Sequence, residues 1–203
     1  MKILVFDTCL DKMYVVLRTE DKILSSEVVE NTDSKYHSAF LISTISKVLQ
    51  ENNVKPKDLN AIGINIGPGS FTGIRACTTV ARVMAQQLNI KAIGVSSLEI
   101  LSKLTPDNAL VALDARKNKA YLWSDGKVQG AIELEKVQEL ASGGKYNVIT
   151  DNRLQKILGG TSYQQNSYPL GEILSDLVLK KLETESGNWA ELMPLYIQPP
   201  PMG

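Results

Sequence analysis

The sequence predicts an α/β protein of two related β-β-β-α lobes, of which the second is abbreviated. An apolar run that ends in an aspartate occurs twice, as Leu4-Val5-Phe6-Asp7 and as Val111-Ala112-Leu113-Asp114. Seven residues after each aspartate stands a tyrosine, Tyr14 or Tyr121, within a second run of strand-forming residues. Internal repetition of this kind indicates a duplicated structural unit.

The first part of the chain, residues 1–104, is expected to form the N-terminal lobe. Short apolar runs between turn residues predict strands, and apolar residues at helical spacing predict helices. The expected strands are residues 3–6, 13–17, 22–30, 61–66 and 90–94, and the expected helices are residues 34–52, residues 70–88 and one that begins at Ser96.

The remaining part, residues 105–203, is expected to form the smaller C-terminal lobe. It repeats the three opening strands, but the residues after them are too few for the helices and the adenosine-binding loop of an active nucleotide-binding lobe. The expected strands are residues 110–114, 120–122, a run from Lys127, and residues 146–150, and the expected helices are residues 152–158 and 171–182.

Composition excludes several classes of protein. Of the 203 residues, 43% are hydrophobic and 22% are charged, which is the balance of a soluble globular chain rather than of a disordered, collagenous or coiled-coil one. The 22 basic and 22 acidic residues cancel, so bulk charge attracts the chain to neither nucleic acid nor membrane. The longest stretch without a charge, residues 59–74, is shorter than the ~20 residues of a membrane helix.

The N-terminus and the cysteines favour the cytoplasm. The chain meets an acidic residue at Asp7, too early for the apolar region of a secretory signal. Its two cysteines, Cys9 and Cys77, are too few for a disulfide framework, and we expect both thiols to be reduced.

A single histidine, His37, limits the possible chemistry. A catalytic zinc usually takes two or three histidines and a structural zinc takes four cysteine or histidine ligands, so neither site is expected, although an all-carboxylate magnesium site stays possible. As a general base His37 would need a nucleophile and an orienting group, and the sequence marks neither. We expect His37 to begin a helix at a surface or an interface.

The two aspartate turns are the candidate phosphate and metal sites. Two related lobes of this kind are the pattern of the actin, hexokinase and Hsp70 group, in which the aspartate turn of each lobe faces nucleotide phosphates and metal. Turns that cradle phosphate usually need glycine so that the backbone can approach closely. Here Cys9-Leu10 and Arg116-Lys117 stand where glycines would serve. We therefore expect neither a cofactor nor catalysis at these turns.

The segment Gly67-Pro68-Gly69-Ser70-Phe71-Thr72-Gly73 joins a predicted strand to a predicted helix. It has neither the Gly-Lys-Ser/Thr ending of a P-loop nor the glycine spacing of a dinucleotide fingerprint. Ser70 is expected to cap the helix, and Phe71 is expected to be exposed in the first turn. Glycine at position 73 lowers helix stability, which indicates that a backbone or a partner approaches closely there.

The two helices at residues 34–52 and 70–88 carry more apolar residues than one core-facing stripe needs, which indicates an interface with another protein. Phe40 and Phe71 are the expected anchors, because aromatic residues at the centre of an interface often dominate its energy. The full set of expected interface residues is His37, Phe40, Leu41, Ile45, Val48, Ser70, Phe71, Arg75 and Arg82.

Several of these motifs together resemble the TsaB family, also called YeaZ. They are Asp7-Thr8, His37-Ser38, the whole stretch from Gly67 to Arg75, Gly94-Val95-Ser96-Ser97-Leu98-Glu99 and Asp114-Ala115-Arg116. The resemblance is strong from residue 1 to about residue 124 and weak beyond it. Cys9 stands where the family usually has serine.

The resemblance implies an actin-like (ASKHA) fold and a non-catalytic partner subunit. The family acts in the complex that adds N6-threonylcarbamoyl to adenosine 37 of tRNAs that read codons beginning with A, where it stabilises the catalytic subunit TsaD. The implied partners are TsaD and TsaE homologues, with a homodimer when the chain is alone, tRNA contact only through the complex, no membrane and no catalytic, cofactor or metal site. The alternative is a stand-alone actin-fold ATP-dependent phosphotransferase or ATPase.

Overall fold

The computed structural model describes residues 1–30 and 37–198, and the chain forms two compact units. Unit 1 consists of residues 1–97 and 169–195, and unit 2 of residues 98–168 with residues 196–198. The chain therefore leaves unit 1 to form unit 2 and then returns, whereas the sequence suggested one division at residue 104. No helix in the described residues is long and apolar enough to cross a membrane.

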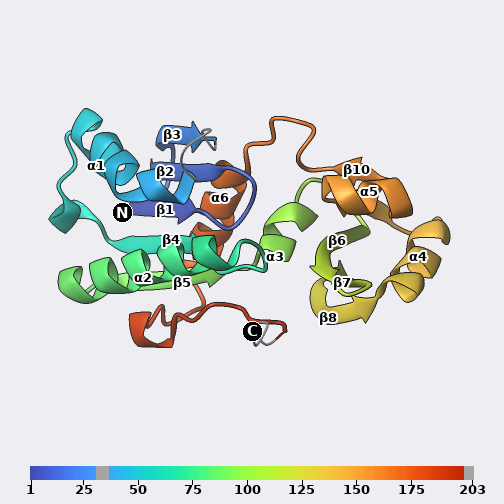
Figure 1. Cartoon of the computed structure of the whole chain (residues 1–203). Helices are drawn as coiled ribbons and strands as arrows, with labels where there is room; N and C mark the ends of the chain where they lie inside the picture. The colour runs from blue at the N-terminus through green and yellow to red at the C-terminus, as the bar shows by residue number, and fades with distance from the viewer. Residues whose placement is uncertain (31–36, 199–203) are drawn as a thin grey trace. The chain divides into compact units, whose positions relative to one another are not determined.

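Unit 1 contains a five-stranded sheet in the order β3-β2-β1-β4-β5. The pairs β1–β2 and β2–β3 are antiparallel, and the pairs β1–β4 and β4–β5 are parallel (Figure 1). Alternation of side chains in β1 sends Leu4 and Phe6 to one face of the sheet and Ile3 and Val5 to the other, and all four are buried. Its strands are β1 (Lys2–Asp7), β2 (Met13–Thr19), β3 (Ile23–Val29), β4 (Ala61–Asn65) and β5 (Lys91–Val95).

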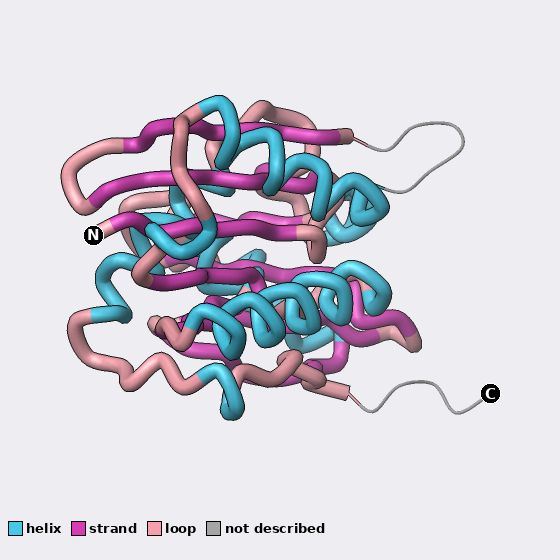
Figure 2. The backbone as a smooth tube through the Cα atoms, turned by 90° about the vertical axis from the view of Figure 1, so that its left-hand side faces the viewer, coloured by secondary structure: helices cyan, strands magenta, loops and turns pink. Residues whose placement is uncertain are grey.

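Helices α1 (Leu41–Glu51) and α2 (Phe71–Leu88) both pack on the face of this sheet that Leu4 and Phe6 line (Figure 2). The apolar residues of both helices join those of β1, β2 and β4 in one core cluster. A short 3-10 helix, η1 (His37–Phe40), precedes α1, and residues 34–36 of the expected helix lie outside the described residues. Unit 1 also contains two further 3-10 helices, η2 (Pro56–Asp58) and η3 (Trp189–Glu191).

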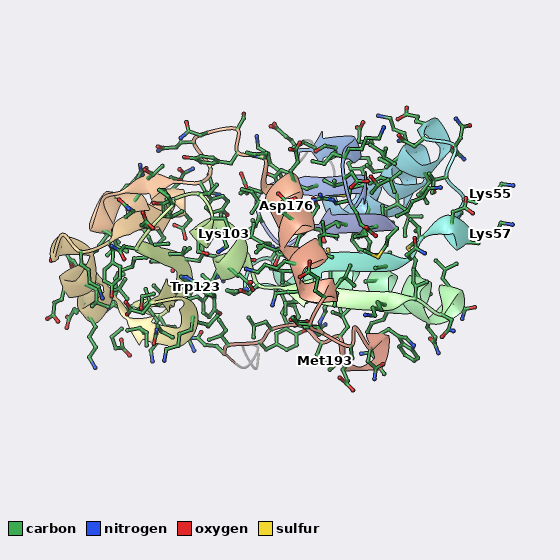
Figure 3. The ribbon with its side chains drawn as sticks, turned by 180° about the vertical axis from the view of Figure 1, so that it is seen from behind. Lys55, Lys57, Lys103, Trp123, Asp176 and Met193 are labelled. Atoms are coloured by element: carbon green, nitrogen blue, oxygen red, sulfur yellow. The ribbon has the colours of Figure 1, made fainter. Side chains whose placement is uncertain are left out.

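Helix α6 (Leu170–Leu182) covers the opposite face of the sheet, which is why the C-terminal segment belongs to unit 1. A Cβ at Gly63 of β4 would collide with the side chain of Val178, so a glycine is needed where this helix crosses the sheet. Arg18 of β2 donates to Ser175 at 2.9 Å and forms an ion pair with Asp176 on the same helix (Figure 3).

Unit 2 contains a second five-stranded sheet, in the order β10-β9-β6-β7-β8. Helices α4 (Leu134–Ser142) and α5 (Asn152–Leu158) contact it, and Val137 and Leu154 join its core cluster. Helix α3 (Ser97–Ser102) links the two units. The strands are β6 (Ala109–Arg116), β7 (Lys119–Ser124), β8 (Lys127–Glu133), β9 (Asn147–Thr150) and β10 (Thr161–Ser162).

The two sheets have the same topology. Numbered in chain order within each unit, both have the order 3-2-1-4-5, with strands 1, 2 and 3 antiparallel and strands 1, 4 and 5 parallel. The predicted fold class, two related β-β-β-α lobes with the second one smaller, is confirmed. Helix α4 follows the third strand of its unit as α1 does in unit 1, and the sequence analysis did not identify it.

Candidate functional site

The first aspartate turn forms a buried polar cluster where β1, β4 and α2 meet. Asp7 ends β1 and is 1% exposed, and Thr8 and Cys9 after it are also buried. Asp7 accepts a hydrogen bond from the Cys9 backbone N–H at 2.5 Å and one from the Asn65 side-chain amide at 2.9 Å. Burial raises the pKa of Asp7 to about 6, and these two hydrogen bonds limit the rise.

The backbone N–H groups of this turn point into the protein. Thr8 N–H donates to Cys77 Sγ at 3.1 Å, and Cys9 N–H donates to the Asp7 carboxylate. A hydrogen bond from the Leu10 backbone also lowers the pKa of Asp7. The donors that could cradle a phosphate at such a turn are therefore already used within the chain.

Asn65, the last residue of β4, holds the aspartate in place. Its amide nitrogen donates to Asp7, while its amide oxygen accepts from Gly67 N–H at 2.8 Å and from Ser97 Oγ at 2.9 Å. Both ends of the amide are thus fixed, which sets the orientation of the carboxylate that it contacts. The sequence pattern assigns no role at this site to Asn65, which ends an apolar strand as Asp7 does, or to Ser97, which stands out only as part of the motif from Gly94 to Glu99.

The glycine-rich segment before α2 lies directly against this turn. A Cβ at Gly73 would collide with the Thr8 carbonyl oxygen, and a Cβ at Gly69 would collide with the Cys9 carbonyl oxygen. The close approach that the sequence indicated at Gly73 is therefore an approach of this chain's own backbone. The expected cap is confirmed, because Ser70 Oγ accepts from Gly73 N–H at 3.2 Å.

Two thiols complete the cluster. The ligand atoms of Asp7, Cys9 and Cys77 lie within 4.8 Å of one another, and all three residues are buried. Cys9 Sγ donates to the Asn65 carbonyl oxygen at 3.1 Å. Burial, followed by the neighbouring Cys77 thiol, raises the pKa of Cys9 well above its usual value, so the thiol is protonated and a poor nucleophile at neutral pH. The proximity of the two cysteines could not be expected from the sequence, because 68 positions separate them and the contacts of the Thr8-Cys9 turn with Gly69, Ser70 and Gly73 bring them together.

The second aspartate turn, in unit 2, is more exposed than the first, because Asp114 is partly exposed and Arg116, Lys117 and Asn118 are exposed. Asp114 forms an ion pair with Arg153 of α5, and its backbone N–H donates to the Asp151 carboxylate at 2.7 Å. The residues of the following hairpin turn, Arg116, Lys117 and Asn118, all have left-handed φ, with values of 60°, 47° and 60°. The chain reverses direction here although the turn contains no glycine.

The expected interface residues divide into two groups. Leu41, Ile45 and Val48 are buried in the core cluster of unit 1, so they have no surface left for a partner. Phe71 is 40% exposed, as expected, and the Arg75 guanidinium lies 3.9 Å from its ring centroid.

The other expected interface residues lie on or near the same two helices. Phe40 is half-buried against the core, Ser70 is the exposed cap of α2, and Arg82 is half-buried with its Nη1 3.2 Å from Met193 Sδ. His37 begins η1, and its side chain lies outside what the structure describes.

The duplicated sheets, each with an aspartate at or near the end of its first strand, define an α/β protein of the actin-like class. The chain resembles a solved protein from Pseudomonas aeruginosa described as having similarity to peptidase YEAZ, with a TM-score of 0.75, 21% identity and coverage of 97% of this chain and 99% of that one. That likeness establishes the fold.

Sequence comparison identifies the family. The chain is 31% identical to tRNA threonylcarbamoyladenosine biosynthesis protein TsaB of Buchnera aphidicola subsp. Schizaphis graminum, over 68% of this chain and 71% of the relative. It is 27% identical to TsaB of Bacillus subtilis over 98% and 94%. Residues 22–150 also match the family model described as TsaD: tRNA N6-adenosine threonylcarbamoyltransferase. The chain belongs to the TsaB (YeaZ) family.

Proposed function

We propose that the chain is a non-catalytic subunit in the biosynthesis of N6-threonylcarbamoyladenosine at position 37 of tRNAs that read codons beginning with A. In this proposal it binds and stabilises a TsaD homologue, which carries the catalysis, and a TsaE homologue joins the pair. The names of its TsaB relatives and the match to the TsaD family model support the pathway and the partner.

The hydrogen bonds within the Asp7 turn are the observation that most strongly supports the non-catalytic role. The backbone donors of Thr8 and Cys9 are bonded to Cys77 and Asp7, so they are not free to hold a nucleotide phosphate. The nearby candidate nucleophiles are also held, because the Thr8 hydroxyl donates to the Gly73 carbonyl oxygen at 2.6 Å and burial raises the pKa of the Cys9 thiol. A phosphotransferase or an ATPase would need these groups in another arrangement.

The exposed side of α1 and α2 is the surface that we propose for the partner. Three large apolar side chains lie on it, Ile42 at 59%, Phe71 at 40% and Val83 at 53% exposure. Apolar side chains of this size that two neighbouring helices leave uncovered are typical of association sites. The proposal keeps Phe71, Arg75 and Arg82 from the sequence analysis and replaces Leu41, Ile45 and Val48 with Ile42 and Val83.

The same surface gives a homodimer when no TsaD homologue is present. In that state the exposed sides of α1 and α2 would pair with the same helices of a second copy, because a two-fold contact uses one patch twice. The TsaD homologue would then compete with the second copy for Phe71 and its neighbours. Contact with tRNA is left to the other subunits, in keeping with the zero formal net charge of this chain.

A pair of matched variants tests this surface. Phe71 and Leu140 are each 40% exposed, and each lies on a helix, α2 in unit 1 or α4 in unit 2. We expect Phe71→Glu to abolish the homodimer in sedimentation and to prevent co-purification with the TsaD homologue, while Leu140→Glu changes neither. Truncation of such an anchor commonly costs ~2 kcal/mol or more of binding energy, and Phe71→Glu also places an unpaired carboxylate in the contact.

The modification assay decides the function itself. Threonylcarbamoylation of tRNA by the TsaD and TsaE homologues should require this chain, should fail with Phe71→Glu and should proceed with Leu140→Glu. The proposal would be contradicted if tRNA modification did not depend on this chain. It would also be contradicted if the pure chain hydrolysed ATP and Asp7→Ala abolished that hydrolysis. Leu41→Glu is unsuited to this test, because Leu41 is in the core and the variant would unfold.

A further inference from the structure

We propose that Asp7, Cys9 and Cys77 form a binding site for a thiophilic divalent cation of the Zn²⁺ class. This site is independent of the proposed partner function, and its role would be to join the first aspartate turn to α2. Cys9 lies in the turn after β1 and Cys77 lies in the second turn of α2, so one bound ion would link segments far apart in the chain.

The donor set fits such a cation. Thiolates bind Zn²⁺ at about 2.3 Å and carboxylate oxygens at about 2.0–2.2 Å, so neighbouring ligand atoms of a tetrahedral site lie roughly 3.5–3.8 Å apart. The ligand atoms of Asp7, Cys9 and Cys77 already lie within 4.8 Å of one another. A contraction of at most about 1.3 Å would complete the geometry. Two sulfur donors favour Zn²⁺ over Mg²⁺ or Ca²⁺, which prefer oxygen ligands alone.

Oxygen atoms next to each sulfur can supply a fourth ligand. The Asn65 carbonyl oxygen lies 3.1 Å from Cys9 Sγ, and the Thr8 hydroxyl oxygen lies 3.1 Å from Cys77 Sγ. Either oxygen lies beside a sulfur ligand, so an ion held between the two thiols could reach it with little rearrangement of the turn.

Groups around the three ligands already orient them. Asn65 donates to one carboxylate oxygen of Asp7, and Thr8 N–H donates to Cys77 Sγ at 3.1 Å. Hydrogen bonds of this kind to ligating groups are the usual outer shell of a protein metal site.

The charge balance also favours a cation. Asp7 is buried, and within residues 1–30 and 37–198 no lysine or arginine forms an ion pair with it. Buried charges are usually paired or coordinate metals. On binding, the two thiols each lose one proton to solvent, so Zn²⁺ with two thiolates and one carboxylate carries a net charge of −1. The N–H donors of Thr8 and Cys9 face that charge.

Cobalt titration of the full chain tests the site. The untagged protein is reduced, freed of metal with a chelator and titrated with Co²⁺, whose tetrahedral thiolate complexes absorb in the near ultraviolet. We expect a thiolate-to-cobalt band that saturates at one ion per chain and that Zn²⁺ removes by displacement. Zn²⁺ binding in unbuffered solution should release two protons per ion.

Single substitutions assign the ligands. Cys9→Ser, Cys77→Ser and Asp7→Asn should each weaken Zn²⁺ binding by more than the roughly 10- to 100-fold that loss of an outer-shell partner costs. His37→Gln is the matched control, because it removes the only histidine of the chain and should leave the affinity unchanged. Circular dichroism verifies that each variant is folded.

The titration of the unsubstituted chain needs no variant and can overturn the proposal by itself. Absence of a thiolate-to-cobalt band in reduced, folded protein would mean that the two thiols only pack against each other. A band that survives Cys9→Ser, Cys77→Ser or Asp7→Asn at full affinity would mean that the ion binds elsewhere, and would equally overturn the assignment.

Discussion

Asp7 and Asp114 lie at or near the end of the first strand of each sheet, and their surroundings differ. Asp7 in unit 1 is 1% exposed and accepts hydrogen bonds from Cys9 and Asn65. The side chain of Asp114 in unit 2 is 23% exposed and forms an ion pair with Arg153. The same topology therefore supports a buried carboxylate held by neutral donors in one unit and a partly exposed carboxylate held by a cation in the other.

The segment after the fourth strand accounts for the difference. In unit 1, residues 66–70 separate β4 from α2, and this glycine-rich segment folds over the Asp7 turn. In unit 2, Asp151 alone separates β9 from α5, caps that helix and leaves Arg153 of its first turn beside Asp114. A longer loop with glycines at the contact points buries an aspartate that a shorter loop leaves at the surface.

The largest expected effect comes from filling the contact between the loop and the turn. Gly73→Ala places a methyl group against the Thr8 carbonyl oxygen, which is backbone and cannot rotate away. We expect a loss of about 3 kcal/mol or more in the free energy of unfolding of unit 1, at or above the upper end of what overpacking costs. Urea unfolding in a Trp123→Phe background measures it, because Trp189 of unit 1 is then the only tryptophan.

Gly143→Ala in unit 2 is the matched control for that variant. Its φ of −71° suits any residue, and its added methyl group would meet nothing closer than 3.5 Å. This substitution should change the stability of unit 2 by less than about 1 kcal/mol, in either direction. Equal losses from both glycine substitutions would mean that the contact at Thr8 is not what requires Gly73.

The second prediction concerns the pH dependence of stability. The pKa of Asp7 rises from 3.8 to about 6 on folding, so between these values the folded state binds more protons than the unfolded state. The free energy of unfolding therefore falls as pH rises through this window, by at most about 3 kcal/mol from this group at ~1.4 kcal/mol per pKa unit. The contribution of protonated Asp7 is fully present below pH 3.8 and is lost above about pH 6.

Asp7→Asn isolates this contribution. The variant cannot ionise, although its amide nitrogen would face the amide nitrogen of Asn65 and lose one hydrogen bond at every pH. We expect the difference in the free energy of unfolding between the two proteins to shift in favour of the variant as pH rises from 4 to 7. Urea titrations at each pH, with a chelator present, measure this difference. Parallel curves for the two proteins would show that Asp7 titrates as it does in the unfolded chain.

The strands and the duplication could be predicted from the sequence because they depend on local pattern. Apolar runs bounded by polar turns fix the strands, and the repeated Asp-Tyr spacing marks an antiparallel hairpin in each unit. The registers of the two hairpins differ, because Tyr14 pairs with Asp7 whereas Tyr121 pairs with Leu113. The side of each helix that faces the core was harder to predict. Ile42 and Leu41 are adjacent and both apolar, and only the packing of α1 on β2 buries one and exposes the other.

The candidate site could be predicted only in part. The pattern around Gly73 indicated a close approach, but the approaching group, the Thr8 carbonyl, lies 65 positions away and leaves no local signal. The same holds for Cys77, whose ligand atom lies within 4.8 Å of those of Asp7 and Cys9 although the residues are far apart in the sequence. The return of α6 to unit 1 could not be predicted either, because its contact with the sheet joins Val178 to Gly63, 115 positions earlier in the sequence.

The smallest expected effect comes from removing the cation beside the partly exposed Asp114. Arg153→Ala breaks the ion pair with Asp114, and exposed pairs of this kind contribute about 0.2–1 kcal/mol. A cation in the first turn of α5 also opposes the helix dipole, so its loss is partly offset. We expect a loss of less than 1 kcal/mol in the stability of unit 2, about zero in 1 M salt, where charges are screened within roughly 3 Å. Arg153→Lys should restore part of the loss at low salt, and a salt-independent loss as large as that of Gly73→Ala would mean that Asp114 is as tightly enclosed as Asp7.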